Sequence, residues 1–149
     1  MRLFLPGPAD THALGVRLAE RAFPGMILAL VGDLGAGKTA LVRGFAEGLG
    51  CPGRVQSPTF TLVWPHEGGR LPMFHADWYR LGSEAEAAAL GLVELASEGV
   101  LAVEWADRFP ALLPDDRLDV ALADAGEGRE IELVARGPLH RAALGPDLG

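Results

Sequence analysis

Hydrophobic residues occur along this chain in two patterns, as short continuous runs and as residues repeated at helical spacing. The continuous runs at 26–31 and 100–105 are typical of central strands that are covered on both faces of a sheet. Shorter apolar stretches predict five further strands, at 2–5, 60–64, 73–77, 118–123 and 131–135. Glycine-rich turns separate the second of these from the third and the fourth from the fifth, so each of these two pairs is expected to form a hairpin.

Between the strands, apolar residues recur at the spacing of a helix. Four helices are predicted. The first begins at Asp10 or Thr11 and ends before Pro24, and the second spans 38 to about 49. The third spans 83 to about 98 with a break at Gly91, and the fourth spans 139–144. Strands that alternate with helices indicate an α/β fold. We expect residues 1–149 to form a single domain, with a short helix and a frayed end in 138–149.

The composition limits the kinds of partner that the chain can bind. A net charge of −7 argues against broad electrostatic binding to nucleic acid, although a local basic patch or a protein partner that handles RNA stays compatible with it. The single cysteine, Cys51, cannot form an internal disulfide and fits a reducing cytosol. No apolar run is long enough to cross a bilayer, so we expect a cytoplasmic protein without membrane contact.

The chain contains one lysine, Lys38, and uses arginine elsewhere. Lys38 lies between a predicted strand and a predicted helix, in a segment that satisfies the pattern G-x-x-x-x-G-K-[ST] of phosphate-binding loops. In such loops backbone N–H groups point at one anion, the lysine bridges the β- and γ-phosphates, and the hydroxyl of the last residue, here Thr39, binds Mg²⁺. The residues expected to surround the phosphates of a nucleoside triphosphate are Asp33, Leu34, Gly35, Ala36, Gly37, Lys38, Thr39 and Ala40.

A magnesium–triphosphate site also needs a carboxylate at the end of a neighbouring strand. Glu104 ends the apolar run 100–103, and Asp77 ends the strand predicted at 73–77. One of these carboxylates is expected to serve the metal and the other to orient water. Periodicity alone does not assign the two roles.

Thr59 is a third candidate for the site. It follows the helix of the loop, at the place where small GTPases carry a threonine that senses the γ-phosphate. Pro58 stiffens the approach and leaves the Thr59 hydroxyl free to bind Mg²⁺, phosphate or water. An equally good interpretation is that Ser57 and Pro58 only begin a strand.

Four ordered motifs together closely resemble the TsaE family, formerly called YjeE. They are Gly32-Asp33-Leu34-Gly35-Ala36-Gly37-Lys38-Thr39, Ser57-Pro58-Thr59-Phe60, His75-Ala76-Asp77-Trp78-Tyr79-Arg80 and Val103-Glu104-Trp105. The similarity in order and spacing covers about residues 5–134. Members of this family are small bacterial ATPases required for N6-threonylcarbamoyladenosine at position 37 of tRNAs that read codons beginning with A.

This resemblance implies a P-loop NTPase-like, three-layer fold in which a mixed, mostly parallel central sheet carries a nucleotide cleft. It implies that Thr39 and Glu104 hold Mg²⁺ and that Asp77 is essential for the hydrolysis of ATP. Further residues that it places at the nucleotide are Thr11, against the adenine, Thr59, in a mobile switch segment, and Arg129.

The resemblance also implies partners, because family members do not transfer the threonylcarbamoyl group themselves. That step belongs to a TsaD–TsaB pair, on which the ATPase docks and which it resets by hydrolysing ATP. Contact with tRNA is then indirect, in agreement with the net charge of −7. Hydrolysis by the chain alone is expected to be slow, since no arginine finger is guaranteed in cis. One departure from the family pattern is Trp78, where leucine is more common.

Three other functions share the phosphate-binding loop. A GTPase selects guanine with an Asn-Lys-x-Asp segment, and this chain has no asparagine and no second lysine. A small-molecule kinase needs a substrate pocket and an arginine-bearing lid, for which Arg80, Arg108 and Arg117 are the candidates. In the third alternative, nucleotide binding gates a protein interaction and hydrolysis is not required.

Overall fold

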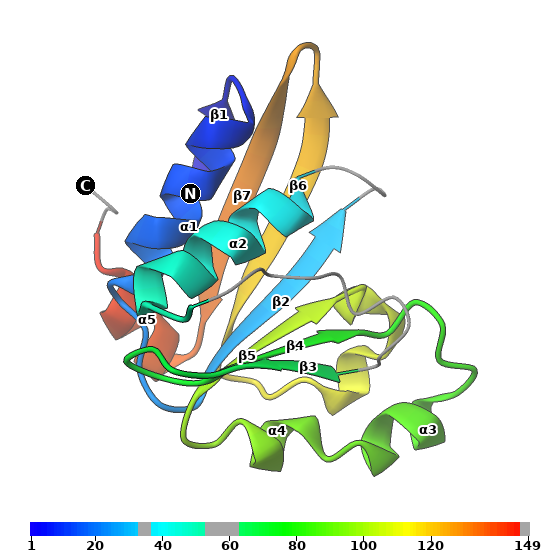
Figure 1. Cartoon of the computed structure of the whole chain (residues 1–149). Helices are drawn as coiled ribbons and strands as arrows, with labels where there is room; N and C mark the ends of the chain where they lie inside the picture. The colour runs from blue at the N-terminus through cyan, green and yellow to red at the C-terminus, as the bar shows by residue number, and fades with distance from the viewer. Residues whose placement is uncertain (33–36, 53–62, 147–149) are drawn as a thin grey trace.

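The computed structural model of the chain describes residues 1–32, 37–52 and 63–146, and within these ranges seven strands form one sheet (Figure 1). Their order in the sheet is β1-β7-β6-β2-β5-β4-β3. The strands are β1 Arg2–Leu5, β2 Met26–Gly32, β3 Val63–His66, β4 Met73–Asp77, β5 Val100–Glu104, β6 Arg117–Ala125 and β7 Gly128–Arg136. The four central strands β6, β2, β5 and β4 are parallel to one another, and the outer pairings are antiparallel.

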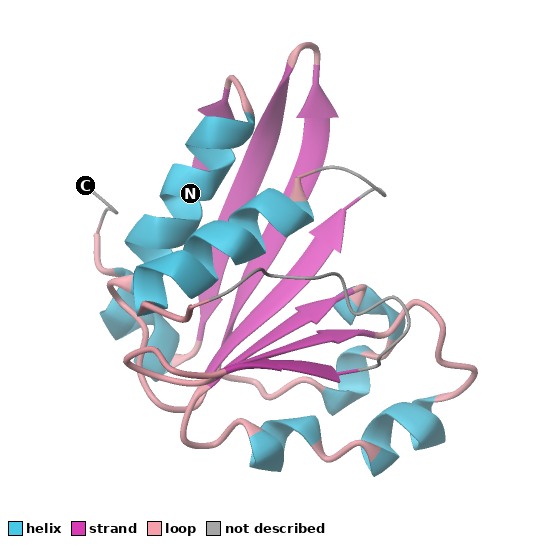
Figure 2. Cartoon of the chain, viewed as in Figure 1, coloured by secondary structure: helices cyan, strands magenta, loops and turns pink. Residues whose placement is uncertain are grey.

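The helices form a layer on each face of this sheet (Figure 2). They are α1 Pro8–Ala19, α2 Lys38–Leu49, α3 Glu84–Ala89, α4 Leu92–Leu95 and α5 Pro138–Leu144. Helices α1 and α2 cover one face, and α3 and α4 lie on the other, together with two 3₁₀ turns, Ala106–Arg108 and Pro110–Leu112. The prediction of a three-layer α/β fold with a mixed, mostly parallel sheet is therefore confirmed. In the part of the chain that the structure describes, no helix has the length and apolar character needed to span a membrane.

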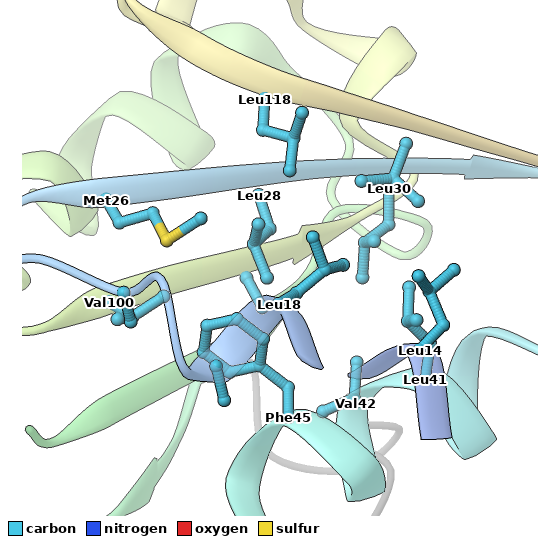
Figure 3. Close-up of a cluster of buried hydrophobic side chains, with 14 of the residues drawn as sticks. Leu14, Leu18, Met26, Leu28, Leu30, Leu41, Val42, Phe45, Val100 and Leu118 are labelled. Atoms are coloured by element: carbon cyan, nitrogen blue, oxygen red, sulfur yellow. The ribbon is translucent and has the colours of Figure 1, made fainter. Parts of the chain in front are cut away.

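Strand β2 explains why a continuous apolar run predicts a central strand. Successive side chains of a strand point to opposite faces. Met26, Leu28 and Leu30 therefore enter the core beneath α1 and α2, where they meet Phe45 (Figure 3). Ile27 belongs to the second core, on the side of α3 and α4. Both faces of the strand are covered, so every position is apolar.

Several predicted boundaries shift in the structure. Helix α1 begins at Pro8 with Gly7 as its N-cap, not at Asp10 or Thr11. Proline at the first helical position has a suitable fixed φ angle, and the Asp10 carboxylate accepts a hydrogen bond from the Gly7 N–H at 3.0 Å. Thr11 therefore lies inside the first turn of α1.

The other differences are smaller. The helical stretch predicted from 83 is two short helices, α3 and α4, separated by Gly91 at a φ of 58°, and it ends at Leu95. The last hairpin is longer than predicted, because β6 and β7 extend to a two-residue turn at Gly126 and Glu127. Of the strand predicted at 60–64, residues 60–62 lie outside the described ranges, and β3 begins at Val63.

Helices α1 and α2 touch through glycines. A methyl group built on Gly15 would lie 2.2 Å from the carbonyl oxygen of Leu41, and one on Gly44 would lie 2.0 Å from that of His12. Both distances are far below van der Waals contact. The two backbones can approach this closely only because neither residue carries a Cβ atom.

The last helix, α5, is held at the start of β2 by the buried imidazole of His140. His140 Nδ1 lies 2.6 Å from the Asp116 carboxylate, and its Nε2 accepts a hydrogen bond from the backbone N–H of Ile27 at 3.0 Å. Arg21 donates to the carbonyl oxygen of Leu144 at 2.8 Å, at the other end of α5. The bonds of Ile27 with His140 and of Arg21 with Leu144 each join residues more than 110 positions apart, and they hold α5 against the start of β2 and the segment that follows α1.

We predict that Gly44→Ala lowers the free energy of unfolding by about 2–3 kcal/mol, because the new methyl group must push the two helix backbones apart. Urea denaturation followed by circular dichroism measures this change. The matched control is Gly82→Ala, since a methyl group there would meet only the flexible end of the Glu86 side chain, at 3.4 Å. We expect the control to lie within about 0.5 kcal/mol of the unmodified protein. Equal stability of the two variants would contradict the close helix contact.

Candidate nucleotide-binding site

The parallel strands bring the two predicted carboxylates to one edge of the sheet. Glu104 is aligned with Leu30 of β2 on one side and with Asp77 of β4 on the other. Paired residues of neighbouring strands point to the same face. Since Ala102 of β5 packs in the core beneath α1 and α2, Glu104 and Asp77 lie on that same face. The N-terminus of α2, which begins at Lys38, is on this side of the sheet as well.

The Lys38 ammonium is buried beside these carboxylates without an ion pair to either. Its Nζ donates a hydrogen bond to the Gly32 carbonyl oxygen at 3.2 Å and lies 4.6 Å from the ring centroid of Trp105. Only 4 % of the residue is exposed. Within the described ranges, no carboxylate lies at ion-pair distance from Nζ. A buried cation held by a neutral carbonyl and an aromatic face is well suited to bind an anionic ligand.

Glu104 is held by a histidine that precedes Asp77 by two residues. His75 Nε2 lies 2.6 Å from Glu104 Oε2, and both side chains are buried. Ionised carboxylate oxygens only accept hydrogen bonds, so with an ionised Glu104 the Nε2–H of His75 is the donor of this bond. The bond occupies one carboxylate oxygen and fixes the direction of the other.

Asp77 is half-buried, and its carboxylate caps the turn that follows β4. Its Oδ1 accepts a hydrogen bond from the Tyr79 backbone N–H at 2.8 Å. Burial raises the pKa of the Asp77 carboxyl, and the neighbouring Glu104 carboxylate raises it further. The hydrogen bond from Tyr79 and the charges of Lys38 and His75 lower the pKa but do not cancel the rise. The folded protein therefore holds the proton of Asp77 more tightly than the unfolded chain does.

Thr11 and Arg129, two of the further residues predicted at the nucleotide, lie at a pocket beside residues of the predicted phosphate-binding segment. A pocket of about 230 Å³ adjoins the start of α2 and is lined by Thr11, Gly37, Ala40 and Arg129 among others. A methyl group on Gly37 would lie 3.7 Å from Thr11 and 3.9 Å from Arg129, so the three residues are neighbours. The Thr11 hydroxyl is buried and has no hydrogen-bond partner among the described residues. Arg129 Nη1 lies 3.1 Å from the Asp124 carboxylate.

Thr39 is half-buried in the first turn of α2, directly after Lys38. The predicted site residues Asp33, Leu34, Gly35, Ala36 and Thr59 lie outside the described ranges. The structure thus brings together Lys38, Asp77 and Glu104 at the strand edge, and Thr11, Gly37, Ala40 and Arg129 at the adjoining pocket.

Sequence reasoning did not foresee the place of Trp105. This residue has a φ angle of 59°, in the left-handed region that is rare for bulky side chains. The turn directs its ring to Lys38 on one side and to Tyr79, at a centroid distance of 4.9 Å, on the other. An aromatic residue directly after the strand-ending acid was the signal available in the sequence. By contrast, Trp78 is buried on the opposite face against Phe109.

Two of the three arginines considered for a kinase lid are engaged in other contacts. Arg108 donates two hydrogen bonds to the carbonyl oxygen of Leu81. Arg117 pairs with the Asp119 carboxylate at 2.7 Å.

The oxygen groups at this edge suit magnesium. Mg²⁺ prefers hard oxygen ligands and is commonly bound by one or two carboxylates together with substrate phosphates, not by an all-protein cage. The Thr39 hydroxyl and the free oxygen of Glu104 are ligands of this kind. The described part of the chain contains no cluster of three or more histidine, cysteine or acidic side chains that could enclose a metal by itself.

The P-loop class of α/β proteins is defined by a strand and a helix that a glycine-rich segment connects, next to a parallel strand that ends in a carboxylate. Strand β2, helix α2 and strand β5 have this arrangement. Within this class, the sequence model of the family "Threonylcarbamoyl adenosine biosynthesis protein TsaE" matches residues 5–131, and the chain belongs to this family. The resemblance seen in the four sequence motifs is thereby confirmed.

Relatives support the same assignment over most of the chain. The tRNA threonylcarbamoyladenosine biosynthesis protein TsaE of Bacillus subtilis is 46% identical over 132 residues, which cover 87% of this chain and 82% of that protein. The protein of the same name from Nostoc sp. is 38% identical over 139 residues, 89% of this chain and 84% of its own. The crystal structure of Bacillus subtilis YdiB superimposes with a TM-score of 0.80 at 36% identity, over 96% of this chain and 90% of that one.

The raised pKa of Asp77 leads to a prediction about stability and pH. Below about pH 3 the carboxyl is protonated in both the folded and the unfolded chain, so it contributes no difference. As the pH rises from the unfolded pKa through the raised folded pKa, the unfolded chain releases this proton more readily than the folded protein, and the folded protein loses stability. We therefore expect Asp77→Asn to raise the melting temperature at neutral pH and to leave it unchanged at about pH 3. The exposed Asp115→Asn serves as the control, and a neutral-pH melting temperature of Asp77→Asn at or below that of the unmodified protein would contradict the assignment.

Proposed function

We propose that this chain is a Mg²⁺-dependent ATPase that acts as an accessory component of tRNA N6-threonylcarbamoyladenosine biosynthesis. One observation carries the proposal: the only lysine of the chain is buried at the start of α2, beside two carboxylates that the sheet register aligns. Membership of the TsaE family and the names of the relatives support the pathway.

In the proposed reaction Lys38 exchanges its bond to the Gly32 carbonyl for the β- and γ-phosphates of ATP. Thr39 and the free oxygen of Glu104 would hold Mg²⁺, which when bound supplies positive charge against the phosphates. The N-terminus of α2 adds partial positive charge at the same place. These groups bind and orient the triphosphate before hydrolysis begins.

Asp77 is proposed to place the attacking water in line with the γ-phosphate, with Thr59 as a second contact. Phosphoryl transfer is accelerated mainly by positioning and by electrostatic stabilisation, so the carboxylate need not be a strong base. The hydrogen bond from Tyr79 engages one oxygen of Asp77, and the other oxygen is proposed to accept from the attacking water. The raised pKa of Asp77 makes it a better proton acceptor than an exposed aspartate.

The pocket beside Gly37 is proposed to take the adenosine. The buried Thr11 hydroxyl can donate to a ring nitrogen or accept from the exocyclic amine of adenine. Arg129 lines the same pocket and can approach the ribose or the α-phosphate. Unpartnered polar groups that only the correct base satisfies are an effective source of specificity.

We further propose that turnover depends on partner proteins of the TsaD and TsaB type, which contact the tRNA, and that the chain works in the cytoplasm. The net charge of −7 supports indirect contact with tRNA, because direct binding to phosphate backbones requires clustered cations. The one cysteine, whose pKa is raised by burial, supports a structural thiol in a reducing compartment.

The test is an ATPase assay of the chain with Mg²⁺, alone and with a TsaD–TsaB pair and tRNA. We expect weak activity alone and strong stimulation by the complete set. Lys38→Ala should abolish ATP binding measured by calorimetry. Asp77→Asn should retain binding and lower kcat by about 100-fold or more, since it removes a group that acts only in the transition state.

Glu47→Gln, on the exposed side of α2, is the control for both variants. Normal turnover by Lys38→Ala would refute the site. Full tRNA modification by Asp77→Asn would instead favour a nucleotide-gated binding module, and phosphorylation of a metabolite would favour a kinase.

A further inference from the structure

Two histidines with unpartnered nitrogens lie on neighbouring strands behind Glu104. The register of the β3–β4 hairpin pairs Trp64 with His75 and His66 with Met73. His66 and His75 are thus diagonal neighbours on one face of the sheet, the face that Met73 shares with the core beneath α1 and α2. Both residues are buried, with exposed fractions of 7 % and 1 %. Their ring centroids are 6.4 Å apart.

The bond to Glu104 engages only one nitrogen of the His75 ring. Nε2 lies 2.6 Å from Glu104 Oε2, so Nδ1 is the nitrogen that is left for another partner. Nδ1 of His75 and Nε2 of His66 are both buried and have no hydrogen-bond partner among the described residues. Buried polar atoms are nearly always hydrogen-bonded, to protein or to ordered water. Two such atoms on adjacent rings therefore point to a shared partner.

A single water molecule can bridge these two nitrogens. The ring centroids are 6.4 Å apart, and neither nitrogen has a partner at the distance of about 3 Å that a direct bond requires. Water has two donors and two acceptors, so it can bond to each nitrogen whether that nitrogen donates or accepts.

We propose that a buried water joins His75 to His66, and that the chain of contacts Glu104–His75–water–His66 fixes the orientation of the Glu104 carboxylate. His75 and His66 are then positioning residues, which act on the ligand only through Glu104. His66, the last residue in this series of contacts, is itself held in place, because its backbone carbonyl accepts a hydrogen bond from the Cys51 thiol at 3.4 Å. The consequence for Mg²⁺ rests on the proposed function, whereas the water does not.

The functional test compares His75→Phe with His75→Gln. The glutamine amide can replace the Nε2–H donor, whereas phenylalanine fills the space without a donor. Calorimetry gives the affinity for ATP with and without Mg²⁺. We expect His75→Phe to reduce the strengthening of ATP binding by Mg²⁺ about 10-fold or more, with metal-free binding unchanged, and His75→Gln to restore it. His66→Phe, which removes the partner at the far end of the chain, should cause a smaller loss.

His12→Phe is the matched control, because His12 also bonds a glutamate, Glu47 at 2.8 Å, but on the exposed surface of α1 and α2. Unchanged coupling between Mg²⁺ and ATP in His75→Phe, or loss of coupling in the control, would overturn the inference and leave the proposed ATPase intact.

A second measurement decides the question without nucleotide. A high-resolution crystal structure should show one water within hydrogen-bond distance of His75 Nδ1 and His66 Nε2. An empty space between the rings would overturn the inference. Because this measurement needs neither ATP nor a variant, failure of ATP binding would count against the proposed function alone.

Discussion

The parallel register of β4, β5 and β2 is the constraint on which the candidate site depends. It aligns Asp77, Glu104 and Leu30, so that the three strands present their last residues at one edge. A slip of one residue in β5 would turn Glu104 into the core beneath α3 and α4 and expose Val103 in its place. Such a slip is unfavourable because it would place the Glu104 carboxylate in an apolar core without His75 as its partner. The hydrophobic cores thus specify where the charges lie.

The site concentrates groups that are costly to bury. An ammonium held by a carbonyl and an indole, a carboxylate bonded to an imidazole and a second carboxylate with a raised pKa lie within one small region. Such groups lower the stability of the free protein and are tolerated because the surrounding strands fix them in place. In the proposed function the charges of Mg²⁺ and ATP balance them, so ligand binding would stabilise the fold as well as fill the site.

Local signals in the sequence predicted much of this arrangement. The bounds of α2 follow from the phosphate-loop motif at one end and from Gly50, which adopts a left-handed conformation, at the other. The strand ends at Asp77 and Glu104 were visible as acids after apolar runs. The assignment of the phosphate-loop residues 33–36 and of Thr59 stays a prediction, since these residues lie outside the described ranges.

What the sequence did not predict depends on contacts between distant segments. The pairing of His75 with Glu104 depends on the register of β4 and β5. The turn at Trp105 places its ring against Lys38, a residue far away in the sequence. The start of α1 differs from the prediction for a local reason, because Gly7 as N-cap and Pro8 at the first helical position begin the helix ahead of Asp10.

The imidazole beneath the sheet gives the last helix a role at a distance. The strand that leads into the phosphate-binding segment has its second N–H satisfied by His140, a residue beyond the 5–131 segment that the family model matches. A fragment trimmed to that segment would retain Lys38, Asp77 and Glu104 but would lose most of β1, the second half of β7 and α5. The backbone N–H of Ile27 would then have no partner at the start of β2, and the sheet would end at a broken strand. The minimal recombinant unit should therefore extend from β1 through Leu144.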